Sequence, residues 1–157
     1  MFQFGTIHDV VIRDLIKYTD SRGWLSELFR EDEIEREYLP AMAYISMTNA
    51  GVARGPHEHV DQADVFAFIG PSNFKIYLWD NRKESPTFQS KFFFIAGEES
   101  PKSVIIPAGV VHAYKNVGSS LGMVVNFPNR LFSGRGKKEP IDEIRHENQA
   151  DSKFILD

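Results

Sequence analysis

The chain has 157 residues, no cysteine and a formal net charge of -4 at pH 7. This length fits one domain, residues 1–157, and a hydrophobic fraction of 42% is enough for one core. The missing cysteines exclude disulfides, a thiol nucleophile and a thiolate metal site. The net negative charge provides no positive electrostatic potential that would attract nucleic acid. No run of apolar residues is long enough to cross a lipid bilayer as a helix. We therefore expect a soluble, cytoplasmic domain without nucleic-acid or membrane partners.

The first forty residues predict strands joined by polar turns. Residues 2–12 carry apolar side chains at loosely alternating positions, which favours a strand. A turn-forming group at 20–23 precedes a second alternating stretch, in which Glu27 and Leu28 face opposite sides. The acidic residues 31–40 are expected to form a short helix or loop that ends at Pro40.

Short strands are predicted from residue 41 to residue 128. In the first of them, 41–48, Tyr44 and Ser46 share one face because side chains alternate along a strand. Further strands are expected near 65–70, 74–82, 90–97, 103–109, 112–118 and 121–128. This spacing, without a long helix, predicts an all-β jelly-roll barrel over roughly 10–128. The polar residues 129–157 form a C-terminal extension, with a short helix expected around 140–147.

Two motifs carry the chemistry. The stretch from 51 to 70 has the spacing G-x5-H-x-H-x4-[acid]-x5-G and contains His57, His59 and Asp64. The stretch from 107 to 116 reads P-x-G-x2-H-x3-N and contains His112. Histidines two apart on a strand face the same side, and titratable rings inside an apolar barrel are costly without partners. These four side chains are therefore candidates for a catalytic or metal site, whereas His8 and His146 are expected at the surface.

The two motifs are those of the cupin superfamily, whose members are small β-barrels with histidines and one acid in a central pocket. Over roughly residues 10–116 the chain more closely resembles the dTDP-4-dehydrorhamnose 3,5-epimerase family. The ordered landmarks are DSRGW at 20–24 with Glu27, GVARGPH at 51–57, DNR at 80–82 with SPT at 85–87, and IPAGVVHA at 106–113. This resemblance implies a cupin-type jelly roll, no cofactor and a homodimer that pairs through an exposed sheet edge.

The resemblance also implies a reaction. The family acts on nucleotide-linked 4-keto-6-deoxy sugars, usually with dTDP, and supplies deoxysugar or surface polysaccharide biosynthesis. His57 takes the position of the family base, while His112 is expected to hold or polarise the sugar. Asp80 is a candidate for orienting an imidazole or for pairing with Arg82, and Tyr44 is a candidate proton donor from another wall.

Further residues match substrate contacts of the family. Arg22 and Arg54 match positions that contact the pyrophosphate, since guanidinium groups suit phosphate oxygens. Glu27 matches a position that faces the nucleotide. His59 and Gln62 lie beside the base in the sequence and are expected to contact the substrate.

Two departures from the family pattern keep other functions open. The segment Gln62-Ala63-Asp64 stands where the family has a lysine, and Val125 stands where it has a tyrosine. Instead, His57, His59, Asp64 and His112 form a ligand set for one divalent transition metal. The alternatives are therefore a metal-dependent cupin enzyme and a non-catalytic sugar-binding cupin. The metal and base roles exclude each other at one nitrogen atom, because an imidazole nitrogen that holds a metal cannot accept a proton.

Overall fold

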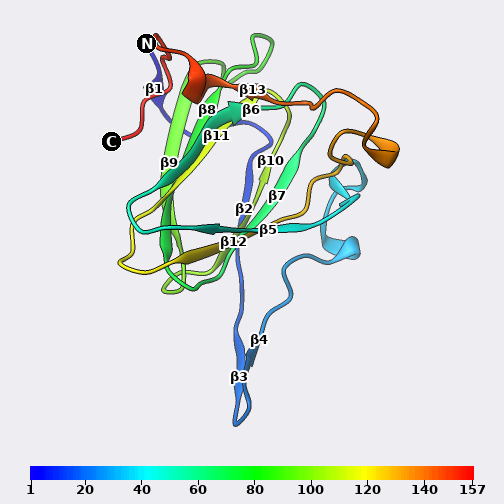
Figure 1. Cartoon of the computed structure of the whole chain (residues 1–157), viewed down its shortest axis with the longest axis vertical. Coiled ribbons are helices and arrows are strands. Elements are labelled where there is room, and N and C mark those ends of the chain that lie inside the picture. Colours follow the sequence, from blue (N-terminus) through cyan, green and yellow to red (C-terminus); the bar gives the residue numbers. More distant parts are fainter.

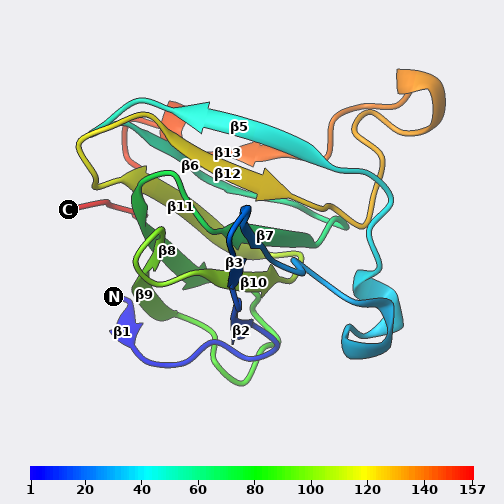
Figure 2. The same cartoon turned by 90° about the horizontal axis from the view of Figure 1, so that it is seen from below.

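Two β-sheets pack face to face in the computed structural model, which describes residues 1–157 (Figures 1 and 2). The six-stranded sheet has the order β1 (Gln3–Phe4), β9 (Ser90–Gly97), β8 (Asn73–Asp80), β11 (Val110–Asn116), β6 (Ala53–Glu58) and β13 (Ile144–Arg145). The five-stranded sheet has the order β2 (Val11–Asp14), β10 (Lys102–Ile106), β7 (Asp64–Phe68), β12 (Gly122–Asn126) and β5 (Tyr44–Thr48). The predicted all-β jelly roll is confirmed.

The remaining elements are short. Strands β3 (Tyr18–Asp20) and β4 (Gly23–Leu25) form a hairpin that projects from the barrel (Figure 1). The only helices are the 3-10 turns η1 (Glu31–Glu33), η2 (Arg36–Tyr38), η3 (Arg135–Lys137) and η4 (His146–Asn148), and none could cross a membrane. The prediction of a helix around residues 140–147 is wrong. Residues 144 and 145 instead extend the six-stranded sheet by pairing with β6.

Strand β7 is buried on both sides, which explains its unbroken apolar run after Asp64. Its inward residues Phe66 and Phe68 join the core between the sheets, which also contains Ile7, Phe74, Ile76, Leu78, Val104, Ile106, Val110 and Val124. Its outward residue Val65 lies beneath the segment 34–39, where Ile34 packs against it. Burying both faces in this way fixes the register of β7 and hence the place of Asp64 in the barrel.

The C-terminal extension wraps around the outside of the six-stranded sheet. Phe154 packs against Trp79 and Phe2 with ring centroids 5.7 and 5.5 Å apart. The terminal Asp157 accepts hydrogen bonds from Lys75 at 2.6 Å and from the Tyr77 hydroxyl at 2.8 Å. These contacts anchor the end of the chain, so that residues 142–146 are held across the mouth formed by β6.

A single glycine lets β6 approach β11. Gly55 has φ +81°, and a Cβ atom there would lie 2.6 Å from the carbonyl oxygen of His112. Only glycine avoids both the backbone strain and this contact. His57, two residues later, is thereby placed directly opposite His112 in the β6–β11 pairing.

Asp80 ends β8 and anchors the loop that follows. Its carboxylate accepts hydrogen bonds from Arg82 Nε at 2.9 Å, Ser85 Oγ at 2.6 Å and Thr87 Oγ1 at 2.6 Å. Burial opposes its ionisation, but these bonds outweigh burial and lower the pKa of Asp80 to about 2. Asp80 makes no hydrogen bond to a histidine, so the expectation that it orients an imidazole is not met and the alternative pairing with Arg82 is observed.

We predict that Asp80→Asn lowers the free energy of unfolding by about 3 kcal/mol at neutral pH, because it removes the charge on which buried donors converge. The folded pKa lies below that of an unfolded aspartate, so this contribution is present at neutral pH and disappears as pH falls toward 2. Urea unfolding at several pH values measures it. The exposed neighbour Lys83→Ala is the control. A loss that does not depend on pH would contradict the assignment.

Candidate active site

Three histidine rings meet at the mouth of the barrel. His57 on β6 and His112 on β11 are register partners with ring centroids 4.4 Å apart. His59 follows the end of β6, and its ring centroid lies 5.6 Å from that of His57 and 5.7 Å from that of His112. The structure therefore brings together the three histidines that the two motifs predicted.

Asp64 lies at the centre of this cluster with only 1% of its surface exposed. Its Oδ1 accepts hydrogen bonds from the amide groups of Gln62 and Asn126, both at 2.9 Å. Its Oδ2 faces His59 Nε2 at 3.1 Å and His112 Nε2 at 3.4 Å. Burial opposes ionisation, but the two imidazoles outweigh it and hold the pKa of Asp64 far below its usual range. Asp64 thus connects the two sheets, because it lies on β7 and contacts His112 on β11.

The pKa values of His59 and His57 are shifted in opposite directions. Burial disfavours a charge on His59, yet its contacts with Asp64 and with the Asp142 carbonyl oxygen raise the pKa of His59 to about 9. Burial, followed by the neighbouring His112 and His59 rings, lowers the pKa of His57 to about 2. At neutral pH His59 is therefore a cation that balances Asp64, while His57 is neutral and keeps a lone pair for a proton.

Three buried atoms in and beside the cluster have no hydrogen-bond partner, and one of them is Asn126 Oδ1. His112 Nδ1 lies 3.0 Å from the carbonyl oxygen of Val110, but His112 Nε2 makes no hydrogen bond, and neither does Asp64 Oδ2. These two atoms face each other at ion-pair distance without the angle of a hydrogen bond. Unpaired buried polar atoms are costly, and the ion-pair contact of 3.4 Å between these two atoms offsets part of that cost.

Tyr44 reaches the cluster through Asn126, a residue that the sequence analysis missed. Asn126 Nδ2 donates to Tyr44 Oη at 2.8 Å as well as to Asp64, so the phenol accepts this bond and keeps its own proton free. The tyrosine is 43% exposed, but its hydroxyl points inward, and burial raises its pKa. Asn126 directly follows Val125, the position at which a tyrosine was expected. Because side chains alternate along a strand, Asn126 faces the opposite side from Val125, and this alternation is the sequence signal that could have identified it.

The C-terminal extension adds two acidic residues that the sequence analysis also missed. The carboxylate of Asp142 accepts backbone hydrogen bonds from Val60 at 2.7 Å, Asp61 at 2.9 Å and Gln62 at 2.8 Å. It thereby fixes the loop between His59 and Asp64. The second acid is Glu143.

Glu143 Oε1 lies 3.9 Å from His57 Nδ1, where a negative charge favours the imidazolium form of His57. The adjoining His146 is buried rather than at the surface. Its Nε2 lies 2.8 Å from Glu58 Oε1 on the other side of β6. No local pattern in the sequence pointed to these tail residues.

The expected substrate-binding residues divide into two groups. Gln62 and His59 belong to the cluster, and Arg54 lies on β6 and bonds to Thr48 Oγ1 at 2.9 Å without an ion pair to any carboxylate. Arg22 is at the hairpin tip, where it pairs with Asp20, far from the histidines of its own chain (Figure 1).

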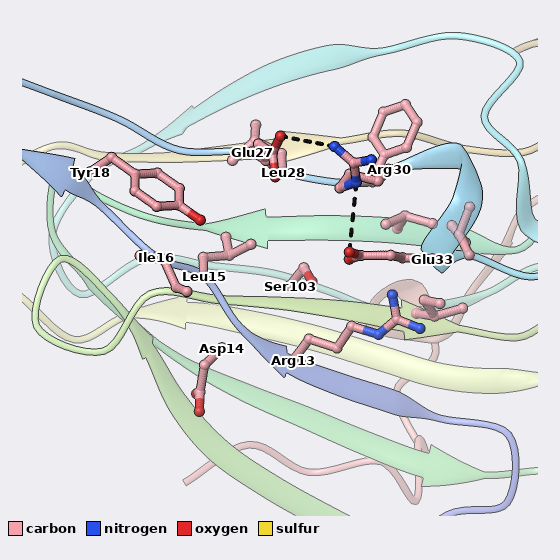
Figure 3. A pocket seen from close by; sticks show the side chains of 14 residues that line it. Arg13, Asp14, Leu15, Ile16, Tyr18, Glu27, Leu28, Arg30, Glu33 and Ser103 are labelled. Carbon is pink, nitrogen blue, oxygen red and sulfur yellow. Dashed lines mark hydrogen bonds and ion pairs between the residues drawn. The ribbon is translucent and has the colours of Figure 1, made fainter.

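Glu27 belongs to the second group. It lies outside the barrel in a pocket beside β2 and β10 and pairs with Arg30 at 3.2 Å (Figure 3). The structure therefore does not bring Arg22 and Glu27 together with the histidine cluster of the same chain.

Comparison with known proteins places the chain in a family. The model of the dTDP-4-dehydrorhamnose 3,5-epimerase family matches residues 5–129. The low-salt glycan biosynthesis epimerase Agl13 of Haloferax volcanii is 36% identical over 127 residues, which are 80% of this chain and 81% of that protein. The spore coat polysaccharide biosynthesis protein SpsL of Bacillus subtilis is 31% identical over 127 residues, covering 81% and 83% of the two chains.

A solved structure agrees on the fold. The dTDP sugar isomerase of Desulfovibrio desulfuricans superposes with a TM-score of 0.81 at 16% identity, over 96% of this chain and 91% of that chain. The fold and the histidine cluster define a cupin of the epimerase type. The chain belongs to the dTDP-4-dehydrorhamnose 3,5-epimerase family.

We predict that Asp142→Ala speeds hydrogen exchange at the amides of residues 60–62 by at least roughly tenfold, because each loses a hydrogen bond to a charge that contributes about 1.5 kcal/mol or more. Hydrogen–deuterium exchange followed by mass spectrometry measures the effect. Asp151→Ala, an exposed residue of the same extension, is the matched control. Unchanged exchange in the 60–62 peptide would show that Asp142 does not hold this loop.

Proposed function

We propose that this protein is an epimerase or isomerase of a nucleotide-linked 4-keto-6-deoxy sugar, with dTDP as the nucleotide, in glycan or surface polysaccharide biosynthesis. The family membership supports the reaction type, and the glycan and spore coat relatives support the pathway class. The observation that carries the proposal is geometric: His57 on the six-stranded sheet has Glu143 3.9 Å from its ring, and Tyr44 on the five-stranded sheet has a hydroxyl whose proton is free. The cytoplasmic location expected from the sequence stays a prediction.

The chemistry requires a base and an acid on different sides of the sugar. Hydrogens at C3 and C5 are acidic because their removal gives an enolate that is delocalised onto the C4 ketone oxygen. His57 Nε2 or Nδ1 accepts that proton, and Glu143 beside the ring stabilises the imidazolium that results. Tyr44 then returns a proton to the opposite face of the carbon. Inversion follows because the two groups come from different sheets.

The nucleotide end of the substrate needs a cationic site. Arg54 lies three residues before His57 and has no carboxylate partner, so its guanidinium group is available to pyrophosphate oxygens. Arg22 and Glu27 lie too far from the histidine cluster of the same chain to contact a substrate bound there. Their position on and beside the projecting hairpin supports a site that is completed by a second copy of the chain.

A homodimer would stabilise the projecting β3–β4 hairpin. Tyr18, Trp24 and Leu25 on β3 and β4 are 53%, 50% and 62% exposed, and an isolated two-stranded hairpin is marginal in water. The edge strand β5 also exposes Ile45 and Met47, at 62% and 42%. Contiguous exposed apolar residues of this kind mark protein interfaces. We propose that the hairpin and this edge pack against a second copy.

The reaction is tested by solvent deuterium wash-in at C3 and C5 of a dTDP-4-keto-6-deoxy sugar. We expect His57→Asn to lower the wash-in rate by at least about 100-fold, because a positioned base contributes that much to proton transfer. Tyr44→Phe should still exchange deuterium but should no longer yield inverted product. Mass spectrometry and NMR of the product report both effects.

His8→Asn, which removes an exposed histidine from the same chain, is the matched control and should leave the rate unchanged. Wash-in that survives in His57→Asn would overturn the base assignment. Tight binding of the dTDP sugar without any exchange by the unaltered protein would identify the non-catalytic sugar-binding cupin instead.

The dimer is tested by light scattering on the purified protein, where we expect twice the mass of one chain. Trp24→Asp should shift the equilibrium toward the monomer because it introduces a charge into the apolar hairpin surface. Ile155→Asp, at an exposed position in the C-terminal extension, should have no effect. A monomeric unaltered protein would refute the proposed interface.

A further inference from the structure

Asn126 is a buried amide that links the carboxylate of Asp64 to the hydroxyl of Tyr44. It lies on β12 with 1% of its surface exposed and is the register partner of Tyr44 on β5. Its Nδ2 lies 2.9 Å from Asp64 Oδ1 and 2.8 Å from Tyr44 Oη, whereas its Oδ1 has no hydrogen-bond partner. An unpaired buried acceptor is costly, so a stronger interaction must hold the amide in this orientation.

Asp64 supplies that interaction. A carboxylate oxygen only accepts hydrogen bonds, and an amide side chain carries its donors on the nitrogen alone. Asp64 Oδ1 accepts from Gln62 Nε2 and from Asn126 Nδ2, both at 2.9 Å. Turning the Asn126 amide over would place its oxygen against the Asp64 oxygen, two acceptors with no proton between them. The unpaired Oδ1 is therefore the cost of satisfying the buried carboxylate.

The same orientation determines which way the hydrogen bond to Tyr44 runs. The amide nitrogen of Asn126 carries two hydrogens, one directed to Asp64 and the other to Tyr44. Tyr44 Oη therefore accepts, and its own hydrogen has no acceptor elsewhere in the chain. Tyr114 on β11 differs, because its hydroxyl lies 2.8 Å from Ser46 Oγ and either group can donate. Of these two phenols, only Tyr44 has a proton that the protein leaves unused.

We propose that Asn126 is a positioning residue that directs the Tyr44 hydroxyl proton to the substrate and thereby decides whether the carbon is inverted. The proposal rests on the proposed epimerase function. Asn126 acts through Tyr44, whose oxygen it holds by a donated hydrogen bond. Without that donor, the phenol can give its proton to a protein oxygen, and the proton is then lost to the reaction.

The proton balance shows why the direction of this hydrogen bond matters. His57 removes a proton from the carbon next to the ketone, and the electron pair of that C–H bond forms the enolate. Tyr44 then supplies its hydroxyl proton to the same carbon from the other side. The enolate electron pair forms the new C–H bond, the ketone is restored and Tyr44 is left as a phenolate.

Asn126 also favours the phenolate that this step produces. Burial raises the pKa of Tyr44, and the hydrogen bond donated by Asn126 counteracts that rise because it stabilises the phenolate. The phenolate regains a proton from solvent, which reaches Tyr44 because 43% of its surface is exposed. His57 releases its proton to solvent, so that both groups return to their starting forms.

The proposal is tested with Asn126→Asp, which keeps the shape of the side chain and replaces the donating nitrogen by oxygen. The new carboxyl group carries at most one proton, and the Asp64 carboxylate takes it, so the Tyr44 hydroxyl has to donate to the new group. In the deuterium wash-in assay we expect the ratio of inverted product to incorporated deuterium to fall by at least about tenfold, roughly the factor that one hydrogen bond contributes. A general structural defect would lower both quantities together and leave their ratio unchanged.

Ser46→Ala is the matched control, because it removes the hydrogen bond of the other phenol, Tyr114, and should leave the ratio unchanged. Circular dichroism reports whether the variants fold. If Asn126→Asp does not fold, Asn126→Leu removes the donor without adding a buried carboxyl group and should lower the ratio in the same way. An unchanged ratio in a folded Asn126 variant would overturn the proposal.

A spectroscopic readout separates this proposal from the epimerase function. In NMR of tyrosine labelled with ¹³C at Cζ, the signal of each ring depends on the hydrogen bonds of its hydroxyl. In ligand-free protein, with the Tyr44 signal assigned by Tyr44→Phe, we expect Asn126→Asp to move that signal and Ser46→Ala to move the Tyr114 signal instead. A Tyr44 signal that stays in place would contradict the proposed hydrogen bond. A moved signal in a protein that shows no wash-in would refute the epimerase function and leave the orientation of Tyr44 established.

Discussion

The burial of one carboxylate organises this protein. Asp64 lies at the start of β7, a strand that is covered on both faces, so its position cannot adjust without disturbing the core. A charge in this place requires partners, and the structure supplies them from several elements: Gln62 and Asn126 on one oxygen, and two imidazoles on the other. His59 and His112 are close together because they share this acid, whereas His57 reaches the cluster as the register partner of His112.

The C-terminal extension is the second constraint. Asp142 binds three consecutive amides of the loop that carries Gln62, and Glu143 faces His57. Both residues are held at the mouth because β13 pairs with β6 and because Phe154 is buried against Trp79 farther along. The extension is therefore part of the candidate site, and its anchoring on the outer sheet face holds Glu143 beside His57.

The chain departs from its family in charge rather than in shape. The family base position, the R-G-x-H segment and the barrel are kept, and Gly55 explains why that segment needs its glycine. The lysine and tyrosine positions have changed, and Asp64, Asn126 and Tyr44 now form one hydrogen-bonded chain across the five-stranded sheet. Tyr44 lies on β5, the neighbour of the strand that carries Val125, and Asp64 lies in the segment where the family has a lysine.

The sequence alone determined the jelly roll and the meeting of His57, His59, Asp64 and His112, because strand alternation and the two motifs are local patterns. It also placed Tyr44 and Ser46 on one face of their strand, and the role of Tyr44 as a proton donor stays a prediction. It could not reveal Asn126, Asp142 or Glu143, since their roles depend on pairings between distant strands. Asp80 shows the same limit, because only the folded loop decides that its partners are Arg82, Ser85 and Thr87. Which buried polar atoms find partners was decided by tertiary structure, since desolvation has no local signature in sequence.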